Sequence, residues 1–133
     1  MKYLAIILIL AVFLISACTQ QGGGEETAAS ITLLSPRGGE TFTQGQKITI
    51  QYDSVGVHHY QIWFTNNPDF ACDSAGWTII RSHFLDNKTF DNKTFEYTLP
   101  YQNTQTARVR VEGHSAAHVV LGFACSDTFT IKA

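Results

Sequence analysis

The sequence predicts an all-β domain, an antiparallel β-sandwich of about seven strands, and three observations support this. From residue 30 onward, short segments rich in Ile, Val, Thr, Tyr and Phe alternate apolar with polar residues. Turn residues separate these segments, and no stretch has the 3.6-residue period of an amphipathic helix. Short strands at this density are typical of immunoglobulin-like and fibronectin-III-like sandwiches, a class that contains many unrelated functions.

Each predicted strand is an alternating segment whose inward side follows from a period of two residues. The predicted strands cover residues 31–34, 47–52, 59–64, 77–82, 94–99, 107–112 and 128–132. The predicted core side chains are Ile48, Ile50, Tyr52, Tyr60, Ile62, Phe64, Phe95, Tyr97, Leu99, Ala107, Val109, Val111, Phe129 and Ile131. Two sheets that share these side chains would enclose one core.

The amino-terminal 29 residues are predicted to lie outside this domain. Lys2, a continuous apolar run over residues 4–15 and the small residues Ser16 and Ala17 have the layout of an export signal. The run is shorter than the roughly 20 apolar residues that a transmembrane helix needs. Residues 1–17 are therefore predicted to be a signal peptide, residues 18–29 a flexible tether and residues 30–133 the sandwich domain.

The segment Ile15-Ser16-Ala17-Cys18 resembles the lipobox of prokaryotic lipoproteins. The resemblance implies that Cys18 becomes the mature amino terminus and carries a diacylglyceryl group. Two acyl chains on one residue give stable anchoring, whereas a single chain gives marginal binding. The protein is therefore expected at the cell membrane, lipid-anchored through Cys18 and facing outside the cytoplasm.

The domain itself has a second resemblance, carried by the element Ser-Pro-Arg-Gly-Gly-Glu at residues 35–40 and by later strand segments. These segments are residues 48–52, 95–100, 107–111 and 126–131. Together they resemble the Ig-like domain named for yeast serine/threonine-rich GPI-anchored cell-wall proteins, which is widespread in prokaryotic surface proteins. The resemblance implies a surface sandwich with no known catalytic motif.

Charge and motif content argue against several functions. Removal of the predicted signal peptide takes away Lys2 and leaves 8 basic residues against 11 acidic ones, a net charge of −3. This negative charge disfavours binding to nucleic acid. No Gly-x-Ser-x-Gly sequence or papain-like cysteine context appears. We therefore expect neither an enzyme nor a bound cofactor.

Cys72 and Cys125 are the cysteines that remain once Cys18 is acylated, and export favours their oxidation. We expect a disulfide, which would contribute about 4 kcal/mol to stability by closing a loop of about 50 residues. The pairing requires that the last strand be bulged or begin early, near residues 118–121, because the two cysteines otherwise lie at opposite ends. Two free thiols are the alternative.

Three further sets of residues are candidate sites. Trp63, Arg108 and Arg110 would share an exposed sheet face that could bind a sugar or a protein, unless the arginine stems simply cover the indole. Two Asn-x-Thr sequons give candidate glycosylation sites at Asn87 and Asn92. Loop histidines could form a metal cluster, although no spacing fixes a ligand geometry and solvated histidines are the alternative. These histidines are His58, His59, His83, His114 and His118.

The sequence therefore predicts a lipid-anchored cell-surface binding or adhesion module. Its expected partners are the membrane, through Cys18, and a cell-wall glycan or surface protein. A metal-binding surface lipoprotein and a purely structural envelope component are the alternatives.

Overall fold

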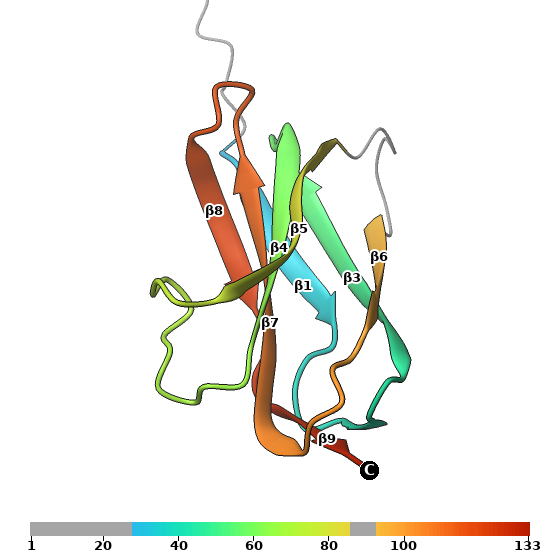
Figure 1. Cartoon of the computed structure of the whole chain (residues 1–133). Coiled ribbons are helices and arrows are strands. Elements are labelled where there is room, and N and C mark those ends of the chain that lie inside the picture. The colour runs from blue at the N-terminus through green and yellow to red at the C-terminus, as the bar shows by residue number, and fades with distance from the viewer. Residues whose placement is uncertain (1–27, 86–92) are drawn as a thin grey trace, which may run out of the picture.

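The computed structural model describes residues 28–85 and 93–133, which form two packed β-sheets (Figure 1). The strands within these residues are β1 (Ser30–Ser35), β2 (Thr41–Thr43), β3 (Lys47–Val55), β4 (His59–Thr65), β5 (Thr78–Leu85), β6 (Lys93–Thr98), β7 (Thr104–His114), β8 (Val120–Cys125) and β9 (Phe129–Lys132). One sheet has the order β1-β3-β6, and the other has the order β2-β9-β7-β4-β5, with β8 also paired to β7. No helix in the described part of the chain could cross a membrane.

The predicted β-sandwich is confirmed, with nine strands in place of seven. The strands that the sequence pattern missed are β2, which is only three residues long and pairs in parallel with β9, and β8. β8 pairs with the second half of β7 and β9 with the first half, so residues 126–128 interrupt what would otherwise be one long strand. β8 begins at Val120, which is the early start near residues 118–121 that the expected disulfide allows.

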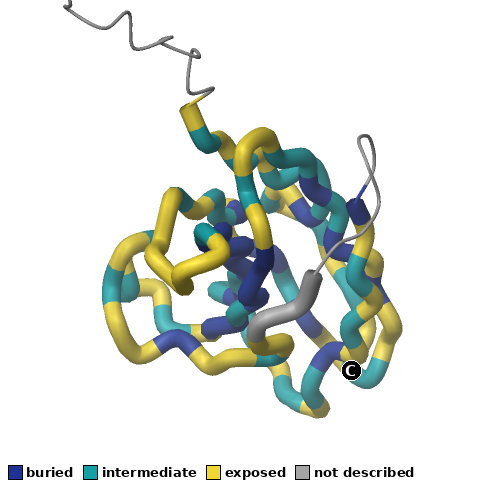
Figure 2. Tube along the Cα trace, turned by 90° about the horizontal axis from the view of Figure 1, so that it is seen from above, coloured by how far each residue is buried: buried dark blue, intermediate teal, exposed yellow. Residues whose placement is uncertain are grey.

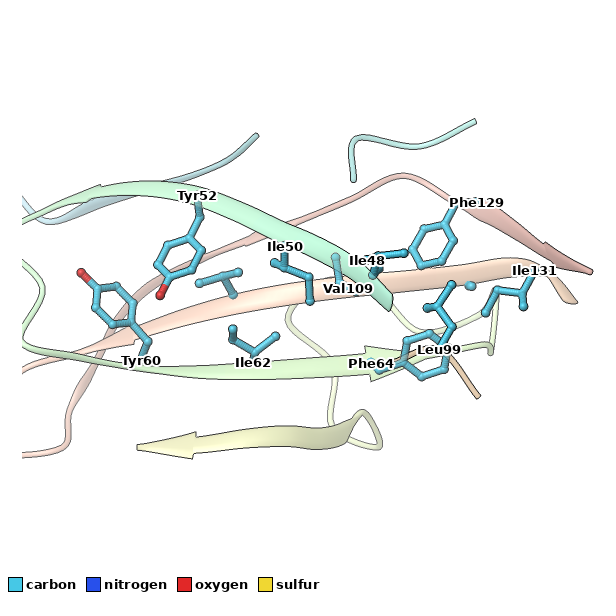
Figure 3. Packing of buried hydrophobic residues seen from close by; sticks show 12 residues of the cluster. Ile48, Ile50, Tyr52, Tyr60, Ile62, Phe64, Leu99, Val109, Phe129 and Ile131 are labelled. Carbon is cyan, nitrogen blue, oxygen red and sulfur yellow. The ribbon is translucent and has the colours of Figure 1, made fainter. Parts of the chain in front are cut away.

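The core lies between the two sheets and consists of the side chains that strand alternation placed inward (Figure 3). Twelve of these are buried, whereas Phe95 and Tyr97 are half-buried and pack against the core from β6. Seen from above, buried positions occupy the middle of the domain and exposed ones its outline (Figure 2). Burial of apolar area in this layer is the main stabilising contribution to the fold.

The Ser-Pro-Arg-Gly-Gly-Glu element forms the turn between β1 and β2. The Glu40 carboxylate accepts hydrogen bonds from the backbone N–H groups of Arg37 and Gly38, each at 2.7 Å. Burial by itself would raise the pKa of Glu40, but these hydrogen bonds and the Arg37 charge hold that pKa below its usual value. Gly38 has a φ of 125°, and a Cβ there would lie 2.4 Å from Cβ of Asp127. The motif is thus explained by turn geometry and close packing.

Lys93 begins β6 at an inward position and is buried. Its ammonium group donates a hydrogen bond to Ser54 Oγ at 2.7 Å and another to the Tyr60 hydroxyl. The same ammonium lies 4.7 Å from the centroid of the Tyr60 ring. These hydroxyl and ring contacts offset the cost of removing the charge from water.

Gly113 in β7 and Gly122 in β8 are cross-strand partners with different surroundings. A Cβ at Gly113 would lie 2.6 Å from Cδ1 of Ile31 and 2.8 Å from Cγ1 of Val57. A Cβ at Gly122 would meet nothing within 4 Å. The close approach of β1 and the β3–β4 turn to β7 therefore depends on glycine at position 113 only.

We predict that Gly113→Ala lowers the free energy of unfolding by about 1–3 kcal/mol, because the added methyl group overpacks the contact with Ile31 and Val57. Gly122→Ala, the matched control, should change it by about 0.5 kcal/mol or less. Urea denaturation of both variants measures the difference. Equal effects of the two substitutions would contradict the packing described here.

Candidate functional site

The predicted binding face of Trp63, Arg108 and Arg110 lies on the outer side of its sheet, as alternation requires, but the expectation that it is exposed is wrong. Arg110 is only 5% exposed, and Trp63 and Arg108 are half-buried. The physical reason is the long connection between β4 and β5, residues 66–77, which packs against β7, since Arg108 and Arg110 of that strand donate hydrogen bonds to its backbone carbonyl groups. In Figure 1 this connection is the large yellow-green loop beside β7. We call this segment the covering loop.

Arg110 binds the covering loop to the sheet. Its Nη1 atom donates hydrogen bonds to the backbone carbonyl oxygens of Cys72, at 2.7 Å, and of Ser74, at 3.1 Å. The guanidinium carbon lies 4.7 Å from the centroid of the Trp63 ring and 5.1 Å from that of the Trp77 ring. One side chain thus combines hydrogen bonds to the loop with cation–π contacts to indoles of the sheet and the loop.

Two further attachments hold the same loop. Arg108 donates from Nη1 to the carbonyl oxygen of Phe70 at 2.7 Å and from Nε to that of Ser126 at 3.1 Å. The structure also joins Cys72 of the loop to Cys125 of β8 by a disulfide, with 5.9 Å between the Cα atoms. The expected pairing of these cysteines therefore fits the fold, and it crosses the outer face of the sheet.

Arg110 also takes part in a row of buried polar side chains along β7. Its Nη2 atom lies 3.6 Å from Oε2 of Glu112, and Oε1 of that carboxylate lies 2.9 Å from Nε2 of His114. Burial lowers the pKa of Arg110, while the negative charges of Glu112 and Asp73 act in the opposite direction. Removing either partner of such a buried pair leaves an uncompensated charge and is typically costly, by about 3–5 kcal/mol.

The structure brings four of the five candidate histidines together, where the β3–β4 turn meets the β7–β8 turn. The rings of His59 and His114 are stacked, with centroids 5.3 Å apart, and the His118 ring lies 4.4 Å from that of His59. His58 Nδ1 lies 3.1 Å from His59 Nδ1. Within residues 28–85 and 93–133, no three His, Cys, Asp or Glu side chains are arranged to hold a metal ion. The contacts of these rings include those with one another, the Glu112 carboxylate and the backbone carbonyl oxygen of His118, which lies 3.4 Å from His114 Nδ1.

Several predicted site residues lie outside the described part of the structure. These are the lipid-attachment residue Cys18, the sequon residues Asn87 and Asn92 and the side chain of His83, whose backbone belongs to β5. The predictions for them stay predictions.

A groove of ≈ 500 Å³ opens beside the covering loop, where β4 and β6 end. No residue that lines it carries a formal charge at neutral pH, and its walls combine aromatic rings with side-chain amides. The lining residues are Phe64, Thr65, Asn66, Asn67, Phe70, Gly76, Thr78, Tyr97, Pro100 and Gln102. Uncharged amide and hydroxyl groups placed around apolar rings are typical of sites for small polar ligands.

The aromatic walls of the groove are fixed by packing. The Phe64 and Tyr97 rings have centroids 5.8 Å apart. The Phe70 ring lies against Gly76, where a Cβ would come within 2.6 Å of Phe70 Cζ, so the ring needs glycine beneath it. Burial raises the pKa of Tyr97, which keeps its phenol protonated and able both to donate and to accept a hydrogen bond.

The polar rim of the groove comes from two loops. The Asn66 amide donates to Oε1 of Gln102 at 3.2 Å, and the Asn67 side-chain oxygen accepts from the backbone N–H of Asp69 at 3.0 Å. Alternation identified Phe64 and Tyr97 only as core residues and gave no signal for the rim. An Asn-Asn pair directly after a strand was the one local hint of polar groups at this end.

No family model matches the chain, and no curated protein or solved structure has significant similarity to it. The two resemblances carried by short motifs therefore stay predictions. The function has to be inferred from the geometry of the site itself.

We predict that Trp63→Ala lowers the free energy of unfolding by about 3 kcal/mol, because the indole is covered and contacts Arg110. The control is Ile79→Ala, at the cross-strand partner of Trp63 on β5, where the side chain is 46% exposed; its effect should stay below about 1 kcal/mol. Thermal and urea unfolding measure both. A stable Trp63→Ala variant would mean that the covering loop does not pack on this face.

Proposed function

We propose that this protein is a lipid-anchored cell-surface binding module whose groove takes a neutral glycan of the cell envelope. The observation that carries the proposal is the uncharged groove lined by aromatic rings and amides. The proposed ligand site is this groove and not the sheet face of Trp63, Arg108 and Arg110, because the covering loop occupies that face. The predicted attachment through Cys18 would place the domain at the outer side of the membrane.

The chemistry of the groove supports a sugar as ligand. The apolar side of a pyranose ring packs on an aromatic side chain such as Phe70 or Tyr97, and its hydroxyl groups exchange hydrogen bonds with amides such as those of Asn67 and Gln102. A charged ligand would leave its charge uncompensated there, because no lining residue is ionised. A folded protein partner usually needs a contact of roughly 1,200–2,000 Å², so a glycan is the preferred ligand.

The position of the groove also supports adhesion. Ser30, at the start of β1, pairs with Val55 at the end of β3, whereas the groove lies where β4 and β6 end, at the opposite end of the strands. In Figure 1 the amino-terminal end of the described chain is at the top and the β6–β7 connection at the bottom. A domain attached through residue 18 would thus hold its groove away from the membrane.

The test is binding of the mature chain, with Cys18→Ser to omit the lipid, to an array of neutral and acidic oligosaccharides. We predict retention of neutral oligosaccharides alone. For the best neutral tetrasaccharide, calorimetry should show that Phe70→Ala and Gln102→Ala each weaken binding about tenfold or more, which corresponds to about 1.4 kcal/mol.

Phe123→Ala is the matched control, because Phe123 is an exposed aromatic residue on β8 outside the groove. It should leave the dissociation constant unchanged. Three results would contradict the proposal. The protein could bind acidic oligosaccharides alone, it could bind none up to millimolar concentrations, or Phe70→Ala and Phe123→Ala could have equal effects.

A further inference from the structure

The connection between β7 and β8 and the first residues of β8, residues 115–121, form a tip at one end of the domain that is largely apolar apart from Ser115 and His118. Val119, Val120 and Leu121 have exposed fractions of 59%, 49% and 38%. No Asp, Glu, Lys or Arg occurs in residues 113–126. Val55, from the neighbouring β3–β4 turn, adds another exposed aliphatic side chain at the same end.

The backbone of this tip satisfies many of its own hydrogen bonds. The backbone N–H groups of Ala117 and Val119 donate to Ser115 Oγ, each at 3.2 Å. The N–H of Ser115 donates to the carbonyl oxygen of Val119 at 2.9 Å, and the N–H of His118 donates to that of Ser115 at 3.0 Å. These backbone groups already have hydrogen-bond partners within the tip. They therefore keep those partners when the tip moves from water into a less polar layer.

The described chain begins beside this tip. Ile31 of β1 and Val57 both approach Gly113, and the backbone N–H of His58 donates to the carbonyl oxygen of His114 at 2.9 Å. In Figure 1 the described chain begins at the end of the domain that carries the β7–β8 connection. Ala28 lies ten residue steps after Cys18, and a chain of that length spans at most about 35 Å.

We propose that the β7–β8 tip docks on the lipid surface of the membrane that anchors the protein. This rests on the proposed anchoring through Cys18. Three aliphatic side chains are too few to hold a domain on a bilayer alone, but a short tether makes their contact intramolecular and raises their effective concentration at the surface. Docking of the tip would fix the orientation of the domain and direct the groove at the opposite end outward.

The test uses the lipidated mature protein, from Cys18 onward, in phosphatidylcholine vesicles whose acyl chains are brominated and quench nearby tryptophan. Leu121→Trp places a reporter in the tip. Tyr101→Trp places a matched reporter at an exposed position of the β6–β7 connection, at the other end. Trp63 and Trp77 give the same background in both variants. We expect at least a twofold loss of the added emission for Leu121→Trp and none for Tyr101→Trp.

Three outcomes would overturn the proposal. Equal quenching of the two reporters in protein that sediments with the vesicles would mean that the anchor holds but the tip does not dock. If the Cys18→Ser variant and the wild type sedimented equally with the vesicles, Cys18 would not be the lipid anchor on which the proposal rests. A concentration-dependent change in Leu121→Trp emission without vesicles would mean that a second copy of the chain covers the tip.

Discussion

The buried guanidinium group of Arg110 is the constraint on which the outer half of this domain depends. A cation removed from water requires hydrogen-bond acceptors and negative charge around it. The carbonyl groups of Cys72 and Ser74 supply the hydrogen-bond acceptors, and Glu112 supplies the negative charge. The indole rings of Trp63 and Trp77 also lie against the guanidinium group. Because the acceptors belong to the covering loop, satisfying the charge also fixes the path of that loop over the sheet.

The groove beside the covering loop follows from this constraint. Phe70 forms one wall of the groove, and its carbonyl oxygen accepts the hydrogen bond from Arg108. The disulfide between Cys72 and Cys125 limits how far the loop can move from β8. The loop is thus held by two arginines and one covalent bond, which also fix the aromatic wall that it carries. Preorganisation of this kind reduces the ordering cost of binding.

The sequence was sufficient for the sandwich and its core because both depend on local alternation. The period of two residues along β4 correctly assigns Tyr60, Ile62 and Phe64 to the inside and Trp63 to the outside. It carries no information on what lies over the outside, because the path of a long loop is decided by contacts between residues distant in sequence. The disulfide could be expected because it needs only two cysteines and an oxidising compartment. The groove could not be expected, because three separate segments of the chain build it. β2 was missed because three residues are too short for a periodic signal.

Acrylamide quenching of intrinsic fluorescence tests whether the covering loop packs on the outer sheet face. The chain has two tryptophans, Trp63 on the sheet and Trp77 at the end of the covering loop, and both contact Arg110. The structure predicts that acrylamide quenches the native oxidised protein several-fold less than it quenches N-acetyltryptophanamide, and that urea unfolding removes this protection. Quenching of the native protein as strong as that of the free indole would contradict the account, because it would mean an open face and an unattached loop.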